Sequence, residues 1–219
     1  MTKAESKVID FIKKHILLFL LVAVTIIAIF LRVCGMDFQS DDFNSFLNSW
    51  WSIIKLNDFT GLATQVGNYN IPYQIIIYLM TLLPLNALYA YKIVSIIFDF
   101  VLAISTAMLA YSFAKNNRRL KAILTYSAVL LSTTVIFNSS FWAQCDSIYT
   151  SFIILAILFL HKDKPIASFV FIGIAFAFKL QTVFIIPVLL YYWISTKKIS
   201  ILHFFIIPAV DVIMCLPAI

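Results

Sequence analysis

The sequence predicts an all-α membrane protein, a polytopic bundle of about seven transmembrane helices. Hydrophobic residues make up 63% of the 219 residues and charged residues only 12%, about half the share that is usual in soluble domains. The mean hydropathy is +0.99, and the apolar residues gather in runs that approach the length of a membrane span. Because so few polar residues cannot cover a soluble globule, we expect an integral membrane protein.

The first expected span follows a basic N-terminal segment. Four lysines, Lys3, Lys7, Lys13 and Lys14, precede the apolar run Ile16–Leu31. This run is long for the core of a signal peptide and no small-x-small cleavage site follows it, so we interpret it as a retained span. After a polar stretch, the apolar run Tyr73–Leu83 is too short to cross the membrane, because a crossing helix needs about 20 residues. We expect an interfacial or re-entrant helix there, on the outer side.

Six further apolar runs complete the expected bundle. The first is long enough to span, whereas several of the others are close to the lower limit for a span. The runs are Leu88–Ala114, Ala122–Phe137, Ser147–Leu160, Ile166–Phe178, Thr182–Ile194 and Ile199–Ile219. The last run is cut off within an apolar stretch. We therefore expect 1–219 to be a single transmembrane domain and the N-terminal portion of a longer module.

The positive-inside rule gives the expected orientation. If Tyr73–Leu83 does not cross, the basic clusters at the N-terminus, 115–121, 161–164 and 196–198 all fall on one side, which places the N-terminus in the cytoplasm. The same rule accounts for the net charge of +6, so no nucleic-acid partner is expected. The first loop, 34–88, then lies outside the membrane with its interfacial helices. Three polar stretches far apart in sequence face that side and could line one cavity.

Two adjacent carboxylates, Asp41 and Asp42, stand in this outer loop. A carboxylate at the membrane surface can accept a proton from a hydroxyl nucleophile, or it can bind a divalent cation. The plainer interpretation is a solvated acidic loop in which Ser40 caps a helix. The three cysteines lack metal-site spacing and the three histidines fall on the inner side, so we assign no metal ligand.

Two later polar segments interrupt apolar surroundings on the same outer side. Gln144 and Asp146 offer donors and acceptors that suit sugar hydroxyls. Alternatively, Asp146 caps the following helix and Trp142 belongs to the interfacial aromatic belt. Lys179, which is followed closely by Gln181, either pairs with a phosphate at the membrane surface or is a snorkelling anchor.

Asp99 lies in the middle of the expected span Leu88–Ala114. An ionisable group at that depth faces the bundle interior and needs a partner, so we expect a buried structural hydrogen bond. A proton relay in a small-solute transporter is the less favoured alternative. The sequence lacks the Gly- and Pro-broken paired helices that are typical of inverted-repeat transporters.

Five short motifs, taken in order, resemble one known family. They are Ser40-Asp41-Asp42-Phe43 with Phe46-Leu47 and Trp50-Trp51, Asn68-Tyr69-Asn70-Ile71-Pro72-Tyr73, Ile97-Phe98-Asp99-Phe100, Asn138-Ser139-Ser140-Phe141-Trp142-Ala143-Gln144-Cys145-Asp146, and Ala177-Phe178-Lys179-Leu180-Gln181. They are similar to motifs of the bacterial relatives of the GPI mannosyltransferase II catalytic subunit, in the glycosyltransferase C superfamily. Asp41 and Ala143 stand where the family has glycine, and Ile71 stands where it has proline.

The resemblance implies sugar transfer at the extracytoplasmic face of a bacterial plasma membrane, within a glycosyltransferase C fold. The donor would be a polyprenyl-phosphate-linked mannose or another hexose, and the acceptor a glycan or a lipid-linked molecule. Asp42 would be the catalytic general base in an inverting attack, and Lys179 with Gln181 would hold the donor phosphate. The residues implied in sugar and acceptor binding are Asp41, Tyr69, Trp142, Gln144 and Asp146. No cofactor is implied with certainty, and a divalent cation stays possible.

A non-enzymatic function also stays open. The chain could be a non-catalytic subunit that binds a polyprenyl lipid or acts as a scaffold, or it could be a lipid-carrier flippase. A natural length of 219 residues would favour these alternatives. An open reading frame that continues past Ile219 would favour the enzyme.

Overall fold

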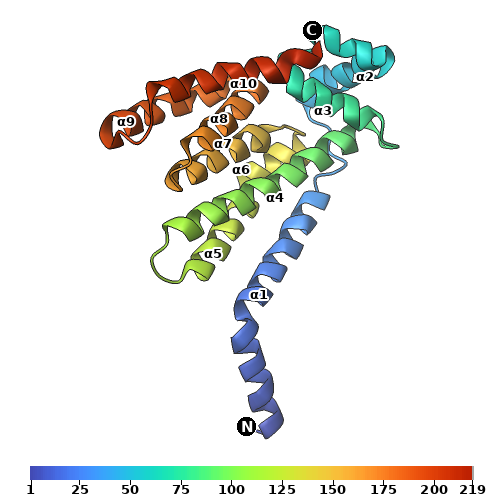
Figure 1. Cartoon of the computed structure of the whole chain (residues 1–219). Coiled ribbons are helices and arrows are strands. Elements are labelled where there is room, and N and C mark those ends of the chain that lie inside the picture. Colours follow the sequence, from blue (N-terminus) through green and yellow to red (C-terminus); the bar gives the residue numbers. More distant parts are fainter. Residues whose placement is uncertain (219) are drawn as a thin grey trace.

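The computed structural model describes residues 1–218, and all regular secondary structure in that part of the chain is helical, with no strand among those residues. A long N-terminal helix leads into a bundle of shorter helices (Figure 1). The helices are α1 (Lys3–Val33), α2 (Asn48–Asn57), α3 (Ile71–Thr81), α4 (Ala87–Phe113), α5 (Arg118–Leu130), α6 (Thr133–Ile136), α7 (Asp146–His161), α8 (Pro165–Phe178), α9 (Ile186–Thr196) and α10 (Ile206–Cys215). Short π-helical turns, Phe43–Leu47 and Phe137–Phe141, and 3₁₀ segments connect several of them. The all-α prediction is therefore confirmed.

Two helices, α1 and α4, are long and apolar enough to cross a membrane. A third span is formed if α5 is taken together with Thr133–Phe141, although the chain bends by 51° between them. The later apolar runs form helices of 10–17 residues, which is shorter than the roughly 20 residues that a hydrocarbon core requires. Two to three spans are thus present by length and composition, and the expected number of seven stays a prediction.

Helix α1 is built to lie in an apolar medium. A capping box between Thr2 and Glu5 starts it, and its 31 residues correspond to a length of about 46 Å. Its first half extends beyond the rest of the bundle (Figure 1), while Val24 and Ala28 in its second half pack against Tyr126 of α5. Large apolar side chains along α1 are exposed, which is stable only where lipid rather than water surrounds them.

The bundle is a row of neighbouring helices. Helix α4 packs against α5 on one side and α7 on the other, α7 packs against α8, and α8 packs against α10 (Figure 1). Aromatic and aliphatic residues of α2, α3, α4 and α7 form one core, and α8, α9 and α10 share a second. The helices α2 and α3 cover one end of this row, so the polar segments that precede and follow them are held against the ends of α7 and α8.

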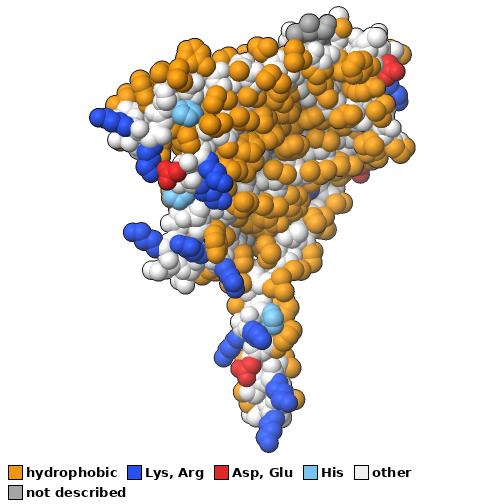
Figure 2. Space-filling model, in the orientation of Figure 1, with side chains coloured by type: hydrophobic (Ala, Val, Ile, Leu, Met, Phe, Trp, Pro, Cys, Tyr) orange, Lys and Arg blue, Asp and Glu red, His pale blue; other side chains and the backbone are white. Residues whose placement is uncertain are grey.

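The basic turns lie together at the other ends of these helices, away from α2 and α3. The rings of Phe113 and His161 are 4.0 Å apart, which joins the end of α4 to the end of α7. Lys198 pairs with Asp163 at 2.8 Å and joins the turn after α9 to the turn after α7. Figure 2 shows lysine and arginine side chains gathered along this side and around the free half of α1. This one-sided arrangement is the one that the expected topology requires.

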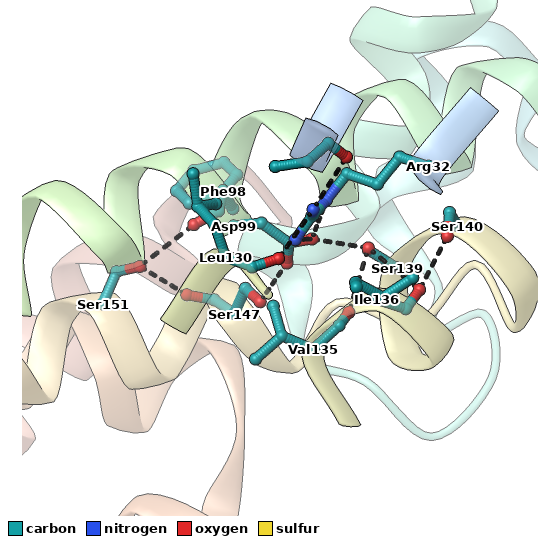
Figure 3. A network of polar contacts seen from close by, with 11 residues as sticks. Arg32, Phe98, Asp99, Leu130, Val135, Ile136, Ser139, Ser140, Ser147 and Ser151 are labelled. Atoms are coloured by element: carbon teal, nitrogen blue, oxygen red, sulfur yellow. Dashed lines mark hydrogen bonds and ion pairs between the residues drawn. The ribbon is translucent and has the colours of Figure 1, made fainter. Parts of the chain in front are cut away.

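A buried polar network ties α1, α4 and α7 together (Figure 3). Arg32 of α1 pairs with Asp99 of α4, and both side chains are almost completely buried. Asp99 also accepts hydrogen bonds of 2.5 Å from Ser139 and from Ser147. Arg32 further donates to the carbonyl oxygen of Leu130 at 3.0 Å. Asp99 therefore makes the buried hydrogen bonds that were expected, and in addition it forms an ion pair with Arg32.

A buried lysine fastens the loop that leads from α1 to the outer segment. Lys92 of α4 donates to the carbonyl oxygens of Gly35 and Met36 at 2.7 and 3.0 Å, and also to that of Phe38. Three carbonyl acceptors match the three donors of an ammonium group. This contact fixes the position from which the next segment, which contains Asp42, starts.

Candidate functional site

A cavity of about 1130 Å³ opens at the end of the bundle opposite the basic turns. Its walls come from four segments that are far apart in sequence: the start of the helix after α1, the loop before α3, the turn before α7, and the junction after α8. The predicted site residues that line it are Asp42, Tyr69, Trp142, Gln144, Asp146, Lys179 and Gln181. The fold therefore brings together three polar regions that the sequence placed on one side of the membrane.

Asp42 is positioned by a helix start. The hydroxyl of Ser40 accepts a hydrogen bond from the backbone N–H of Phe43 at 3.1 Å, which is the expected capping contact. The same hydroxyl donates to the carbonyl oxygen of Trp142 at 3.3 Å and so docks this turn against the segment before α7. The exposed Asp42 carboxylate then accepts a hydrogen bond of 2.8 Å from the Nε2 of Gln144. Ser40 thus caps the helix while Asp42 lines the cavity, so the two interpretations of this loop hold together.

Gln144 connects two of the walls. While its Nε2 donates to Asp42, its Oε1 accepts a hydrogen bond of 3.0 Å from the hydroxyl of Tyr69. Its backbone N–H donates to the carbonyl oxygen of Asn138 at 2.8 Å. The preceding residue, Ala143, is fully buried and has a φ of 57°, a conformation that glycine adopts more easily. Ala143→Gly would therefore relieve backbone strain at this turn.

Lys179 is held by a carboxylate and by aromatic rings. Its Nζ donates to Oδ1 of Asp146, and the second carboxylate oxygen accepts a 2.9 Å hydrogen bond from Nδ2 of Asn138. The ammonium lies 5.3 Å from the ring centre of Tyr69 and 5.7 Å from that of Tyr149, within the range of cation–π attraction. Only 16% of the Lys179 side chain is exposed. It is therefore a paired residue of the cavity rather than a snorkelling anchor.

Asp146 departs from the plain capping interpretation. It is the first residue of α7 rather than its N-cap, and the cap residue Cys145 makes no side-chain hydrogen bond to the helix. A carboxylate in the first turn still interacts favourably with the helix dipole. Its two oxygens, however, are used by Lys179 and Asn138. The sequence motif contained Asn138, but only the tertiary contact identifies it as a site residue.

Aromatic side chains form the wall around Tyr69. Its ring lies 5.5 Å from that of Trp50 and 4.9 Å from that of Tyr73, measured between centroids. Burial, and next the nearby Cys145 and Asp146, raise the pKa of the Tyr69 hydroxyl above its usual value. The hydroxyl therefore stays protonated at neutral pH and acts as a donor. Trp50 stands in the first sequence motif and lines the cavity, but it was not among the predicted site residues.

Three predicted site residues differ from the others, because their side chains make no hydrogen bond within residues 1–218. Asp41 is exposed and does not line the cavity, so its assignment to sugar or acceptor binding has no support from the geometry. It points elsewhere because neighbouring residues on a helical turn face different directions. Gln181 and Trp142 line the cavity and are exposed, but neither side chain has a hydrogen-bond partner within residues 1–218.

Across residues 1–218, no three His, Cys, Asp or Glu side chains lie close enough to hold a metal ion. The cavity instead combines a carboxylate that is hydrogen-bonded only by an amide with an ammonium that is already paired. These groups can bind an anion and accept a proton.

No family model, no curated protein and no solved structure matches the chain. The fold and the cavity define a class of protein. Its members are helical, with apolar helices of membrane-spanning length and a polar cavity at one end.

Proposed function

We propose that the chain is a membrane glycosyltransferase with a glycosyltransferase C-type bundle of about seven spans. It would transfer mannose or another hexose from polyprenyl phosphate to a glycan or lipid-linked acceptor at the extracytoplasmic face. The observation that carries the proposal is that one cavity is lined by both Asp42 and Lys179, each held by its own partner. A cavity at the end of apolar helices suits a donor whose hydrocarbon chain stays in the membrane.

Lys179 is the proposed phosphate ligand. An ammonium carries three donors, and Asp146 takes one of them. A lipid phosphate entering the cavity would accept from the others. As the bond between sugar and phosphate breaks, negative charge grows on the departing oxygen, and a nearby cation in a partly dry site stabilises this charge. The contact from Asn138 keeps Asp146, and through it the ammonium, in one position.

Asp42 is the proposed general base. Gln144 occupies its Oδ2, and its Oδ1 accepts no hydrogen bond within the described part of the chain. In the proposed step the acceptor oxygen bonds to the anomeric carbon and its proton moves to Asp42. The bond from that carbon to the phosphate oxygen breaks, and its electron pair leaves with the polyprenyl phosphate. A single displacement of this kind inverts the anomeric centre.

The test is native mass spectrometry of the purified full chain, followed by a transfer assay with a polyprenyl-phosphate hexose. We expect wild type to retain a polyprenyl phosphate or its glycoside, and Lys179→Ala to lose it. Lys198→Ala is the matched control, since Lys198 also pairs with an aspartate but at the opposite end of the bundle. Ordinary phospholipid alone in every sample would overturn the proposal. Specific retention without transfer would favour the non-catalytic lipid-binding subunit.

A further inference from the structure

A second cavity, of about 670 Å³, lies among α1, α4 and α5 at the end of the bundle that carries the basic turns. Its volume is within the range of about 300–1,000 Å³ that is typical of small-molecule sites. None of the residues of the proposed transferase site lines it. The two cavities are therefore separate sites.

The walls of this cavity are apolar and suit a hydrocarbon chain. On α4, the lining residues run from Ile104 to Ser112, a rise of about 12 Å along the helix. The hydroxyls of Thr25 and Tyr126 on the facing helices are 3.0 Å apart and bond to each other. Thr25 also donates to the carbonyl oxygen of Leu21. These wall hydroxyls thus have partners within the protein and need none from a ligand.

Two cations line the same cavity. Arg118 begins α5, and Lys162 follows α7 in the neighbouring turn. The Nε of Arg118 donates to the carbonyl oxygen of Ala114 at 2.7 Å, and its guanidinium lies 5.8 Å from the ring centre of Tyr111. These contacts hold the guanidinium in place, and its remaining N–H groups make no hydrogen bond within residues 1–218. A guanidinium held in this way can bind a phosphate with two parallel hydrogen bonds.

The local charge balance favours an anion. The carboxylate nearest to Lys162 in sequence is that of Asp163, which is already paired with Lys198 at 2.8 Å. Further basic residues stand at the same end of the bundle: Lys115 precedes α5, Arg119 and Lys121 lie in its first turn, and Lys164 precedes α8. The cations are at the end of the bundle, and the apolar walls continue from them toward its middle. A membrane lipid has the same order of groups, with a charged headgroup followed by acyl chains.

We propose that this cavity binds one acidic phospholipid, with the headgroup phosphate on Arg118 and Lys162 and an acyl chain along Ile104–Ser112. Basic pockets between apolar helices bind the anionic headgroups of membrane lipids. The apolar walls add the hydrophobic stabilisation of the buried chain. This inference does not depend on the transferase proposal, because it concerns a different lipid at the opposite end of the protein.

The experiment is native mass spectrometry of the full chain in detergent, titrated with phosphatidylglycerol and, separately, with phosphatidylcholine of the same acyl chains. We expect tighter binding of phosphatidylglycerol by wild type. The double variant Arg118→Gln/Lys162→Gln should weaken that binding about tenfold or more, as expected for the loss of two cations beside an anionic headgroup. The matched control is Arg119→Gln/Lys164→Gln, which removes equal charge from exposed positions that do not line the cavity.

A third variant keeps all charges and fills the apolar part instead. Ala122 lines the cavity on α5, and Ala122→Phe should reduce phosphatidylglycerol binding although no cation is lost. Equal weakening by the two double variants would mean that general surface charge attracts the lipid, and it would overturn the proposal. Equal binding of the two lipids by wild type would also overturn it.

Discussion

Arg32 and Asp99 form an ion pair in the interior of the bundle, with 1% and 0% of their side chains exposed and 2.9 Å between Nη2 and Oδ2. The same carboxylate accepts hydrogen bonds from Ser139 and Ser147. These serines each neighbour a residue of the candidate site, because Asn138 precedes Ser139 and Asp146 precedes Ser147. The buried pair thus connects α1 to the segments that hold Lys179.

Removing one partner of this pair should destabilise the protein strongly. Asp99→Asn leaves the Arg32 charge buried without a counter-charge, and such a change typically costs about 3–5 kcal/mol. We expect a large fall in the thermal unfolding temperature in detergent. The double variant Arg32→Gln/Asp99→Asn should recover much of the loss because it removes both charges. If Asp99→Asn unfolds at the wild-type temperature, the pair does not stabilise the bundle.

Under the proposed function, Asp42→Asn should abolish sugar transfer while the protein stays folded. The residue is exposed, so the fold does not depend on it, whereas loss of a general base typically lowers the rate by about 10²–10⁴-fold. The neighbouring variant Asp41→Asn is the control, since Asp41 is exposed and does not line the cavity. The measurement is turnover of a polyprenyl-phosphate hexose. Unchanged turnover in Asp42→Asn would exclude it as the base.

Tyr69→Phe should slow transfer without a large change in stability. The substitution keeps the ring beside Lys179 but removes the hydroxyl that donates to Gln144. Gln144 would then hold Asp42 less firmly, and a lost hydrogen bond of about 1 kcal/mol corresponds to roughly a fivefold effect on the rate. Tyr149→Phe provides the comparison, because that ring also faces Lys179. Equal effects of the two substitutions would contradict a role for the Tyr69 hydroxyl.

Gly67→Ala should disturb the cavity wall. Gly67 has a φ of +78°, and an added Cβ would come within 2.2 Å of Cε2 of Trp50. Trp50 would have to move, and the backbone strain adds about 1–2 kcal/mol. We expect a lower unfolding temperature and, under the proposed function, weaker retention of the polyprenyl-phosphate donor by native mass spectrometry. Gly61→Ala should have a smaller effect, because its Cβ would meet Asn57 at 3.1 Å and its backbone is not strained.

The positions of the helices could be predicted well from the sequence, and their lengths less well. The expected span Leu88–Ala114 agrees closely with α4, and the expected run Ser147–Leu160 with α7. The run Ala122–Phe137 was expected as one helix, but the chain bends after Leu130. Hydrophobicity alone does not show such a bend, because an apolar run remains apolar whether or not its backbone turns.

Composition and patterning predicted the candidate site only as a set of polar segments on one side, whereas the motif resemblance named individual residues, of which all but Asp41 line the cavity. Residues such as Lys179 and Gln144 stand out because they interrupt apolar surroundings. The sequence did not distinguish Asp42 from Asp41 by composition, and it did not pair Lys179 with Asp146. It also did not pair Arg32 with Asp99, although it indicated that Asp99 needs a partner.

The sequence by itself determined that the chain is helical, apolar and basic at one end. Hydrophobic run length and the placement of lysine and arginine are local properties, and in an apolar medium the backbone must satisfy its own hydrogen bonds, which helices do. Only the tertiary structure decided which polar groups meet. Gln144 is 102 positions from Asp42 and 75 from Tyr69, and contacts over such separations are set by the packing of whole helices rather than by any local pattern.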